Sequence, residues 1–335
     1  MASKSKFLII DGYGILFRSY FAMGDLKTAG GTPIGAIYMS VKTILGLLNR
    51  DDYDFVVIAL DSGSKTFRTE IYSEYKSNRK EPPESLKPQF DIFDEAIAAL
   101  GIANLRVSGF EADDIIATYV KMAKLGKKAI CKNKPIGDID EVADDAVDIT
   151  IASSDKDLMQ LTCDNVCMYD SAKKIVLWAD DVVEKMGVKP SQVLDFLSLV
   201  GDSSDNIPGA FGIGKRTAVK LISQYNSVDE IYTNIESVKP ASVADKLIKS
   251  KENVFMSKRL AALRDDVEIP DIDISFNGVN NNTLKEFGIK YDFKFISDGN
   301  PRKPRGGANN AIGGGKPTMH DKKNLKKEIS QESLF

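Results

Sequence analysis

Nine carboxylates stand where hydrophobic runs end or helical patterns begin, and they are the residues best suited to do chemistry in this chain. They are Asp11, Asp61, Glu111, Asp113, Asp114, Asp155, Asp157, Asp202 and Asp205. The sequence has only one histidine, and its three cysteines lack the spacing of a zinc site. Because clustered carboxylate oxygens suit hard divalent cations, we predict a site for Mg²⁺ or Mn²⁺.

The local sequence also brings several of these acids together. In GFEADDIIATYV, a helix that starts near Glu111 would place Glu111 and Asp114 on one face, with Asp113 a third of a turn away. The segment SSDKDL presents two more acids just after a strand, and GDSSDN presents two on a turn. Three acids in four residues are hard to explain as structure alone, so we interpret them as ligands.

Short apolar runs that end in polar residues alternate with helical patterns and predict the elements that position the acids. The runs are FLIID, FVVIALD, LRVS, DITIASSD and VCMYD. Helical periodicity covers residues 34–48 and 90–100. This alternation predicts an α/β fold with a mostly parallel central sheet and flanking helices. In such sheets the ligand site lies beyond the carboxyl ends of the strands, where Asp11, Asp61 and Asp155 fall.

A glycine-rich segment, IPGAFGIGKRTAVKLI, resembles the helix-hairpin-helix class of DNA binders that read no base sequence. Gly212 and Gly214 would expose backbone N–H groups to a phosphate at the start of a helix, with Lys215, Arg216 and Lys220 nearby. The alternative is an ordinary glycine turn between two helices.

The segment FRTEIYSEYKSNRKEPPESLKPQF mixes basic and aromatic residues before it meets two prolines. Its members are Arg68, Tyr72, Tyr75, Lys76, Arg79 and Lys80. Basic side chains neutralise phosphates while tyrosines stack on unpaired bases, a combination that suits a single strand. Considered alone, the segment would more often be a solvated charged helix, and the surrounding motifs favour the single-strand interpretation.

Composition limits the class of protein and its location. The net charge of −3 includes the nine acids, and their neutralisation by metal would leave the rest of the molecule positive. No apolar run is long enough for a membrane span, and the first residues lead directly into a strand pattern rather than a signal peptide. We expect a cytoplasmic protein without a membrane partner.

Taken together, the motifs closely resemble the 5′ nuclease family, which includes the 5′-3′ exonuclease domain of bacterial DNA polymerase I and the flap endonucleases. The resemblance spans residues 6–296 and depends on LIIDGYGILFRSYFA, FRTEIYSEYKSNR, GFEADD, ASSDKDLMQL and LVGDSSDNIPGAFGIGKRTAVKL. It implies that the nine acids hold two metal ions. It also implies a helical arch over residues 65–100, where Lys76 and Arg79 contact the scissile phosphate and Arg18 and Arg68 flank the passage of the strand.

The family pattern further implies hydrolysis of a phosphodiester to 5′-phosphate and 3′-hydroxyl ends, with two metal ions about 3.5–4 Å apart. The substrate would be DNA with a 5′ flap or 5′ single-stranded end, including RNA primer junctions, so the protein would serve replication and repair at the bacterial nucleoid as a monomer. A K⁺ ion at the glycine hairpin is also implied.

These features divide the chain into three parts. We predict a nuclease core over residues 1–186, a helix-hairpin-helix subdomain with C-terminal helices over 187–296, and a disordered basic linker over 297–335. Residues 131–146 are an insertion to which the sequence assigns no function. The chain ends in QESLF, which resembles a peptide that binds the bacterial sliding clamp through Gln331, Leu334 and Phe335; an accidental tail is the alternative.

Two other functions stay open at this point. The chain could be the amino-terminal part of a DNA polymerase I, or a junction-binding protein without catalysis. The full set of acids disfavours the second, because a binding protein has no need to keep them.

Overall fold

The centre of the molecule is a six-stranded sheet, in a computed structural model that describes residues 4–126 and 147–297. The strands are β1 Lys6–Asp11, β2 Phe55–Ala59, β3 Ala103–Leu105, β4 Asp148–Ala152, β5 Val166–Asp170 and β6 Ile175–Leu177. Their order is β3-β2-β1-β4-β5-β6, and only the edge strand β6 runs antiparallel to its neighbour. The predicted mostly parallel α/β fold is confirmed.

The sheet separates two hydrophobic cores because successive side chains of a strand point to opposite faces. In β1, Leu8 and Ile10 pack toward one core, while Phe7 and Ile9 pack toward the other. The first face is covered by α1 Gly12–Met23, α2 Gly35–Leu48, α4 Gln89–Leu100 and α13 Asn281–Lys290. The helix α5 Ala112–Lys124 covers the second face, where Tyr119 meets Phe7 edge to face.

Strand register brings the carboxyl ends of β2, β1 and β4 to one edge. Asp11 is paired with Ala59 of β2, and Ile10 is paired with Ala152 of β4. The strand order reverses between β1 and β4, because the chain first builds outward through β2 and β3 and then through β5 and β6. A crevice at such a reversal is the usual ligand site of an open parallel sheet.

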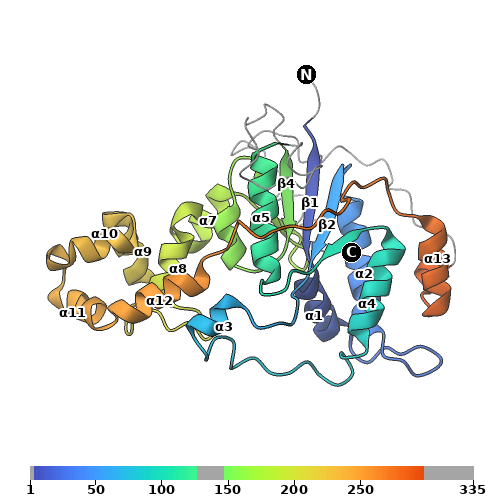
Figure 1. Cartoon of the computed structure of the whole chain (residues 1–335), viewed down its shortest axis with the longest axis horizontal. Helices are drawn as coiled ribbons and strands as arrows, with labels where there is room; N and C mark the ends of the chain where they lie inside the picture. The colour runs from blue at the N-terminus through green and yellow to red at the C-terminus, as the bar shows by residue number, and fades with distance from the viewer. Residues whose placement is uncertain (1–3, 127–146, 298–335) are drawn as a thin grey trace, which may run out of the picture.

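A group of helices extends from one side of this sheet (Figure 1). It comprises α7 Ala179–Met186, α8 Val193–Val200, α9 Lys215–Tyr225, α10 Val228–Thr233, α11 Ala241–Lys249 and α12 Lys251–Ala261. After α12 the chain returns to the sheet, where the Val56 N–H donates to the Ile274 carbonyl at 3.0 Å. The last helices, α13 and α14 Lys294–Ser297, therefore pack on the nuclease core rather than within the predicted C-terminal subdomain.

The predicted arch over residues 65–100 is helical only at its ends. The short helix α3 Phe67–Ile71 is followed by turns, and helix resumes in α4, whose Ile92 and Phe93 are buried in the core. Between α3 and α4 the chain runs as a long connection below the sheet (Figure 1). Pro82 and Pro83 lie in this connection and prevent a continuous helix, because proline lacks the N–H that a helix interior requires.

The predicted insertion at 131–146 and the C-terminal linker lie outside the described residues. Among the helices that are described, none is both long and apolar enough to cross a membrane.

Candidate metal centre and nucleic-acid interface

Four acids interact with one another at the carboxyl edge of the sheet and are called the strand-end group here: Asp11, Asp61 and Asp155, which end or follow strands, and Asp113 in the first turn of α5. Asp11 ends β1 and caps α1 by accepting the Gly14 N–H at 2.9 Å, and its other oxygen accepts the Ser153 hydroxyl at 2.8 Å. Asp61 follows β2 and accepts the Ala112 N–H at 2.8 Å, which ties it to the first turn of α5. Two strand ends and one helix start thus converge, as predicted.

The strand-end group carries more negative charge than its surroundings offset. Burial raises the pKa of Asp11 to about 6, with further contributions from Asp155 and Asp61. Burial and the charges of Asp155 and Asp11 likewise raise the pKa of Asp113 well above its ordinary value. Carboxylates that repel one another in this way are suited to bind a cation, which would restore their ionised form.

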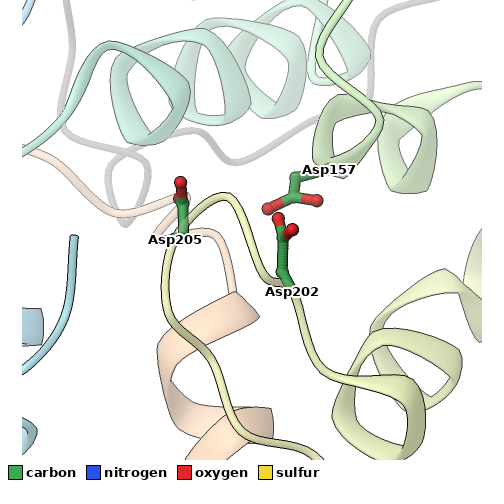
Figure 2. Close-up of side chains that lie close together, drawn as sticks. All are labelled: Asp157, Asp202 and Asp205. Atoms are coloured by element: carbon green, nitrogen blue, oxygen red, sulfur yellow. The ribbon is translucent and has the colours of Figure 1, made fainter. Parts of the chain in front are cut away.

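Three further acids, Asp157, Asp202 and Asp205, form a loop group whose ligand oxygens lie within 4.8 Å of one another (Figure 2). Asp157 begins the 3₁₀ helix η2 Asp157–Leu161, and burial together with the charges of Asp155, Asp202 and Asp205 raises its pKa to about 8. Its buried Oδ1 has no hydrogen-bond partner in the described part of the chain. An orphaned buried carboxylate oxygen beside two other acids fits a divalent metal ion.

Two glycines hold the loop that carries Asp202 and Asp205. The ends of the loop pair through backbone hydrogen bonds between Asp202 and Ile207 of 2.8 and 2.9 Å. Gly201 and Gly209 both have positive φ, and a Cβ at either would lie 2.4 Å from the backbone of the other strand of the loop. Larger residues would therefore separate the two sides and move the acids.

The turns after α3 lie against this loop and bring Lys76 and Arg79 to the acids. The Lys76 N–H donates to the Asp205 carbonyl at 3.0 Å, and its ammonium lies 3.0 Å from Glu111 Oε1. Arg79 Nη2 lies 2.6 Å from Asp205 Oδ1. Lys76 adopts a positive φ of 57°, an uncommon conformation for a residue with a side chain. The sequence alone could not have predicted that these turns dock against the loop of Asp205.

The structure corrects three of the predicted roles. Asp114 is fully buried, and its two oxygens accept hydrogen bonds from the Arg68 guanidinium, both at 2.7 Å, and from two backbone N–H groups. Arg68 is only 2% exposed, so it is a structural partner of Asp114 rather than a DNA contact. The Tyr75 ring is also buried, and its hydroxyl donates to Glu111 at 3.0 Å instead of leaving the ring free to stack on a base.

Arg68 links three parts of the molecule. Besides Asp114 of α5, it contacts Glu111 at 3.3 Å and donates to the carbonyls of Leu260 and Ala262, at the end of α12, at 2.8 and 2.9 Å. We therefore expect Arg68→Met to destabilise the fold by about 3–5 kcal/mol, because it leaves the Asp114 charge buried without its partner.

Urea unfolding would measure the effect of Arg68→Met. The double variant Arg68→Met/Asp114→Leu is the control, since removal of both charges should recover much of the lost stability. A loss below about 1 kcal/mol in the single variant would contradict the buried pair.

The glycine hairpin has the predicted form. Helix α9 begins at Lys215, and Gly214 precedes it at the cap position. Lys215, Arg216 and Lys220 are exposed and have no ion-pair partner among the described residues. The carbonyl of Gly212 accepts a hydrogen bond from Lys246 Nζ at 3.2 Å, a contact between α11 and the hairpin that the sequence did not indicate.

Other predicted DNA contacts are scattered around the site. Arg18, on α1, lies 3.4 Å from Asp170 and also contacts Ser154. Tyr72 is half-buried and packs against the core, whereas Lys80 is exposed. Sequence reasoning missed Lys156, whose ammonium lies 2.8 Å from Asp202 Oδ1. Its position between Asp155 and Asp157 was the available signal.

Comparison with known families agrees with this geometry. Residues 6–133 match the N-terminal resolvase-like domain of 5′-3′ exonucleases, and residues 188–282 match their C-terminal SAM fold. The chain belongs to the 5′-3′ exonuclease family. Within that family, DNA polymerase I of Streptococcus pneumoniae is 34% identical over 301 residues, which cover 87% of this chain and 32% of the relative. DNA polymerase I of Caldicellulosiruptor bescii is 35% identical over 299 residues, which cover 87% of this chain and 33% of the relative.

This member of the 5′-3′ exonuclease family therefore spans about a third of the length of these polymerase relatives. Solved structures share its fold. A zinc-bound T5 5′-exonuclease aligns with a TM-score of 0.61 at 21% identity, covering 88% of this chain and 97% of its own. The catalytic core of Rad2 in complex with DNA substrate aligns with a TM-score of 0.54 at 14% identity, covering 86% and 88%.

Proposed function

We propose that this chain is a structure-specific, metal-dependent 5′-3′ exonuclease and 5′-flap endonuclease that hydrolyses phosphodiesters to 5′-phosphate and 3′-hydroxyl ends. The observation that carries the proposal is the meeting of the strand-end and loop groups of acids beside Lys76 and Arg79. Burial and neighbouring charges raise the pKa values of Asp11 and Asp113 in the strand-end group, and the loop group offers an orphaned carboxylate oxygen. The proposed roles are RNA primer removal during DNA replication and DNA repair, both at the bacterial nucleoid.

The site residues divide into those that hold metal and those that act on the phosphate. We assign Mg²⁺ or Mn²⁺ to the two groups and Glu111. Asp114 is not among the proposed ligands, because both of its carboxylate oxygens accept hydrogen bonds from Arg68. When bound, such cations would activate a water for in-line attack and neutralise the leaving 3′ oxygen. Burial would lower the pKa of Lys76, but Glu111 and Asp205 outweigh it and keep the ammonium charged. A fixed cation at this point would stabilise the charge that develops on the phosphate.

A 5′-labelled flap oligonucleotide tests this function. With Mg²⁺ the protein should release a flap whose 3′-hydroxyl terminal transferase can extend, and it should leave a 5′-phosphate at the nick that DNA ligase can seal. EDTA should stop the release. Binding of the flap without cleavage, at any Mg²⁺ or Mn²⁺ concentration, would favour a junction-binding protein instead.

The duplex next to the flap is proposed to contact the hairpin before α9. Its glycines offer backbone N–H groups, and the exposed Lys215, Arg216 and Lys220 offer charge. A K⁺ ion at the hairpin stays part of the proposal, although at the Gly212 carbonyl it would have to compete with Lys246.

Lys215→Ala should weaken duplex binding and flatten its salt dependence by about one phosphate contact, because one released counterion is lost. The logarithm of Kd measured against the logarithm of salt concentration gives the slope. Lys285→Ala, an exposed lysine on α13, is the matched control and should leave the slope unchanged. An unaltered slope in Lys215→Ala would remove this lysine from the interface.

We also propose that the tail QESLF docks on the sliding clamp, although these residues lie outside the described structure. The preceding segment, residues 301–327, holds eight lysines and arginines against one aspartate, which suits a polar tether with an apolar tip at Leu334 and Phe335. A tether raises the local concentration of the enzyme without changing its site.

Deletion of residues 331–335 should leave cleavage of a free flap unchanged and abolish stimulation by the loaded clamp. Titration of purified clamp with a peptide that ends in QESLF gives a direct measurement. No binding under conditions where another clamp ligand binds would refute the docking.

A further inference from the structure

Lys156 places a cation against Asp202 of the loop group. It lies in the chain between Asp155 and Asp157, and its ammonium is 2.8 Å from Asp202 Oδ1. The same oxygen accepts the N–H and the hydroxyl of Ser204 at 3.0 and 2.6 Å. Asp202 therefore faces three donors, and the one that carries charge is Lys156.

Lys156 contacts the loop group at Asp202 Oδ1, and Arg79 contacts it at Asp205 Oδ1. The Lys156 side chain is 42% exposed, so it has room to leave the acids without disturbing the core.

A divalent cation and the Lys156 ammonium would contend for the same oxygens. Asp157 Oδ1 has no hydrogen-bond partner among the described residues. One oxygen from each of the three carboxylates lies within 4.8 Å of the other two, and Asp202 already forms an ion pair with Lys156. We propose that Lys156 is an internal counter-ion that competes with divalent metal at the loop group and is displaced when metal binds. This inference rests on the metal sites of the proposed function but not on DNA cleavage.

The direction of the effect follows from charge. Removal of the ammonium makes the loop group more negative and frees Asp202 Oδ1, so metal should bind more tightly. A unit charge a few ångströms away at an intermediate dielectric changes affinity by about tenfold or more. Without metal, the same change should make the fold less stable, because the acids lose a neutralising partner.

Mn²⁺ titration followed by electron paramagnetic resonance tests the proposal in the absence of DNA. Lys156→Gln should bind Mn²⁺ at one class of sites about tenfold more tightly than the wild type, while Lys156→Arg, which keeps the charge, should stay near the wild type. Lys173→Gln is the matched control, since Lys173 lies 3.4 Å from Asp170 in a similar ion pair away from the loop group. Equal or weaker Mn²⁺ binding by Lys156→Gln would overturn the proposal.

Thermal unfolding adds a second readout. In EDTA, Lys156→Gln should melt below the wild type, and saturating Mn²⁺ should narrow or close that gap, because metal replaces the lost charge. A gap of equal size in EDTA and in Mn²⁺ would show an ordinary structural role and overturn the competition. If the wild type binds Mn²⁺ but cleaves no flap, the proposed nuclease function fails while this inference stands. If the wild type binds no Mn²⁺, both fail.

Discussion

Asp155→Asn is expected to lower flap cleavage by orders of magnitude while flap binding stays within a few-fold. Asp155 belongs to the strand-end group and also contacts Asp157 of the loop group. Its charge raises the pKa of Asp11 and Asp113 in the strand-end group and of Asp157 in the loop group, so it adjoins both. Its Oδ1 also accepts the Asp157 N–H at 2.9 Å, which sets the start of η2. An amide at this position weakens cation binding at both groups and leaves the glycine hairpin untouched.

Single-turnover cleavage and equilibrium binding of the same labelled flap measure the two effects of Asp155→Asn separately. Glu286→Gln is the control, because Glu286 is an exposed acid on α13. Circular dichroism should show the same fold for both variants. Full cleavage by a folded Asp155→Asn protein would remove Asp155 from the site.

Lys76→Ala is expected to lower the single-turnover rate about 10²–10³-fold, the range for the loss of one preorganised group, and to affect binding far less. The ammonium is fixed by Glu111 at 3.0 Å and lies 3.8 Å from Asp205, and the backbone of the same residue is hydrogen-bonded to Asp205. A cation held in place in this way needs little reorganisation as charge develops on the phosphate. Its contribution should therefore appear mainly in the transition state.

The comparison of rate with affinity decides the role of Lys76. Lys42→Ala, an exposed lysine on α2, is the control for the general loss of a positive charge. Equal losses of rate and affinity in Lys76→Ala would make Lys76 a residue that only positions the substrate. A loss of stability as large as that expected for Arg68→Met would instead indicate a structural role.

The sequence by itself was enough to predict the sheet and its acidic edge. The β1 and β2 runs are apolar on both faces, as a strand covered by helices must be, and Asp11 and Asp61 follow them directly. Once two such strands are parallel, their ends fall at the same edge, so local patterns predict a meeting of residues far apart in the chain. The start of α9 at Lys215 was predictable for a similar reason, because the glycines that open the helix are local.

Only the tertiary structure decided which charges face metal and which face one another. Asp113 and Asp114 are adjacent and chemically alike, yet Asp114 points into the core because Arg68, 46 positions earlier, meets it there. Tyr75 and Lys76 were likewise separated by packing, one ring buried and one ammonium held at Glu111. The ion pair between Lys156 and Asp202 could not be recognised either, because the two residues are far apart in the sequence. Such pairings depend on how distant segments dock, since burial makes an unpaired charge costly and selects the partner that lies within reach.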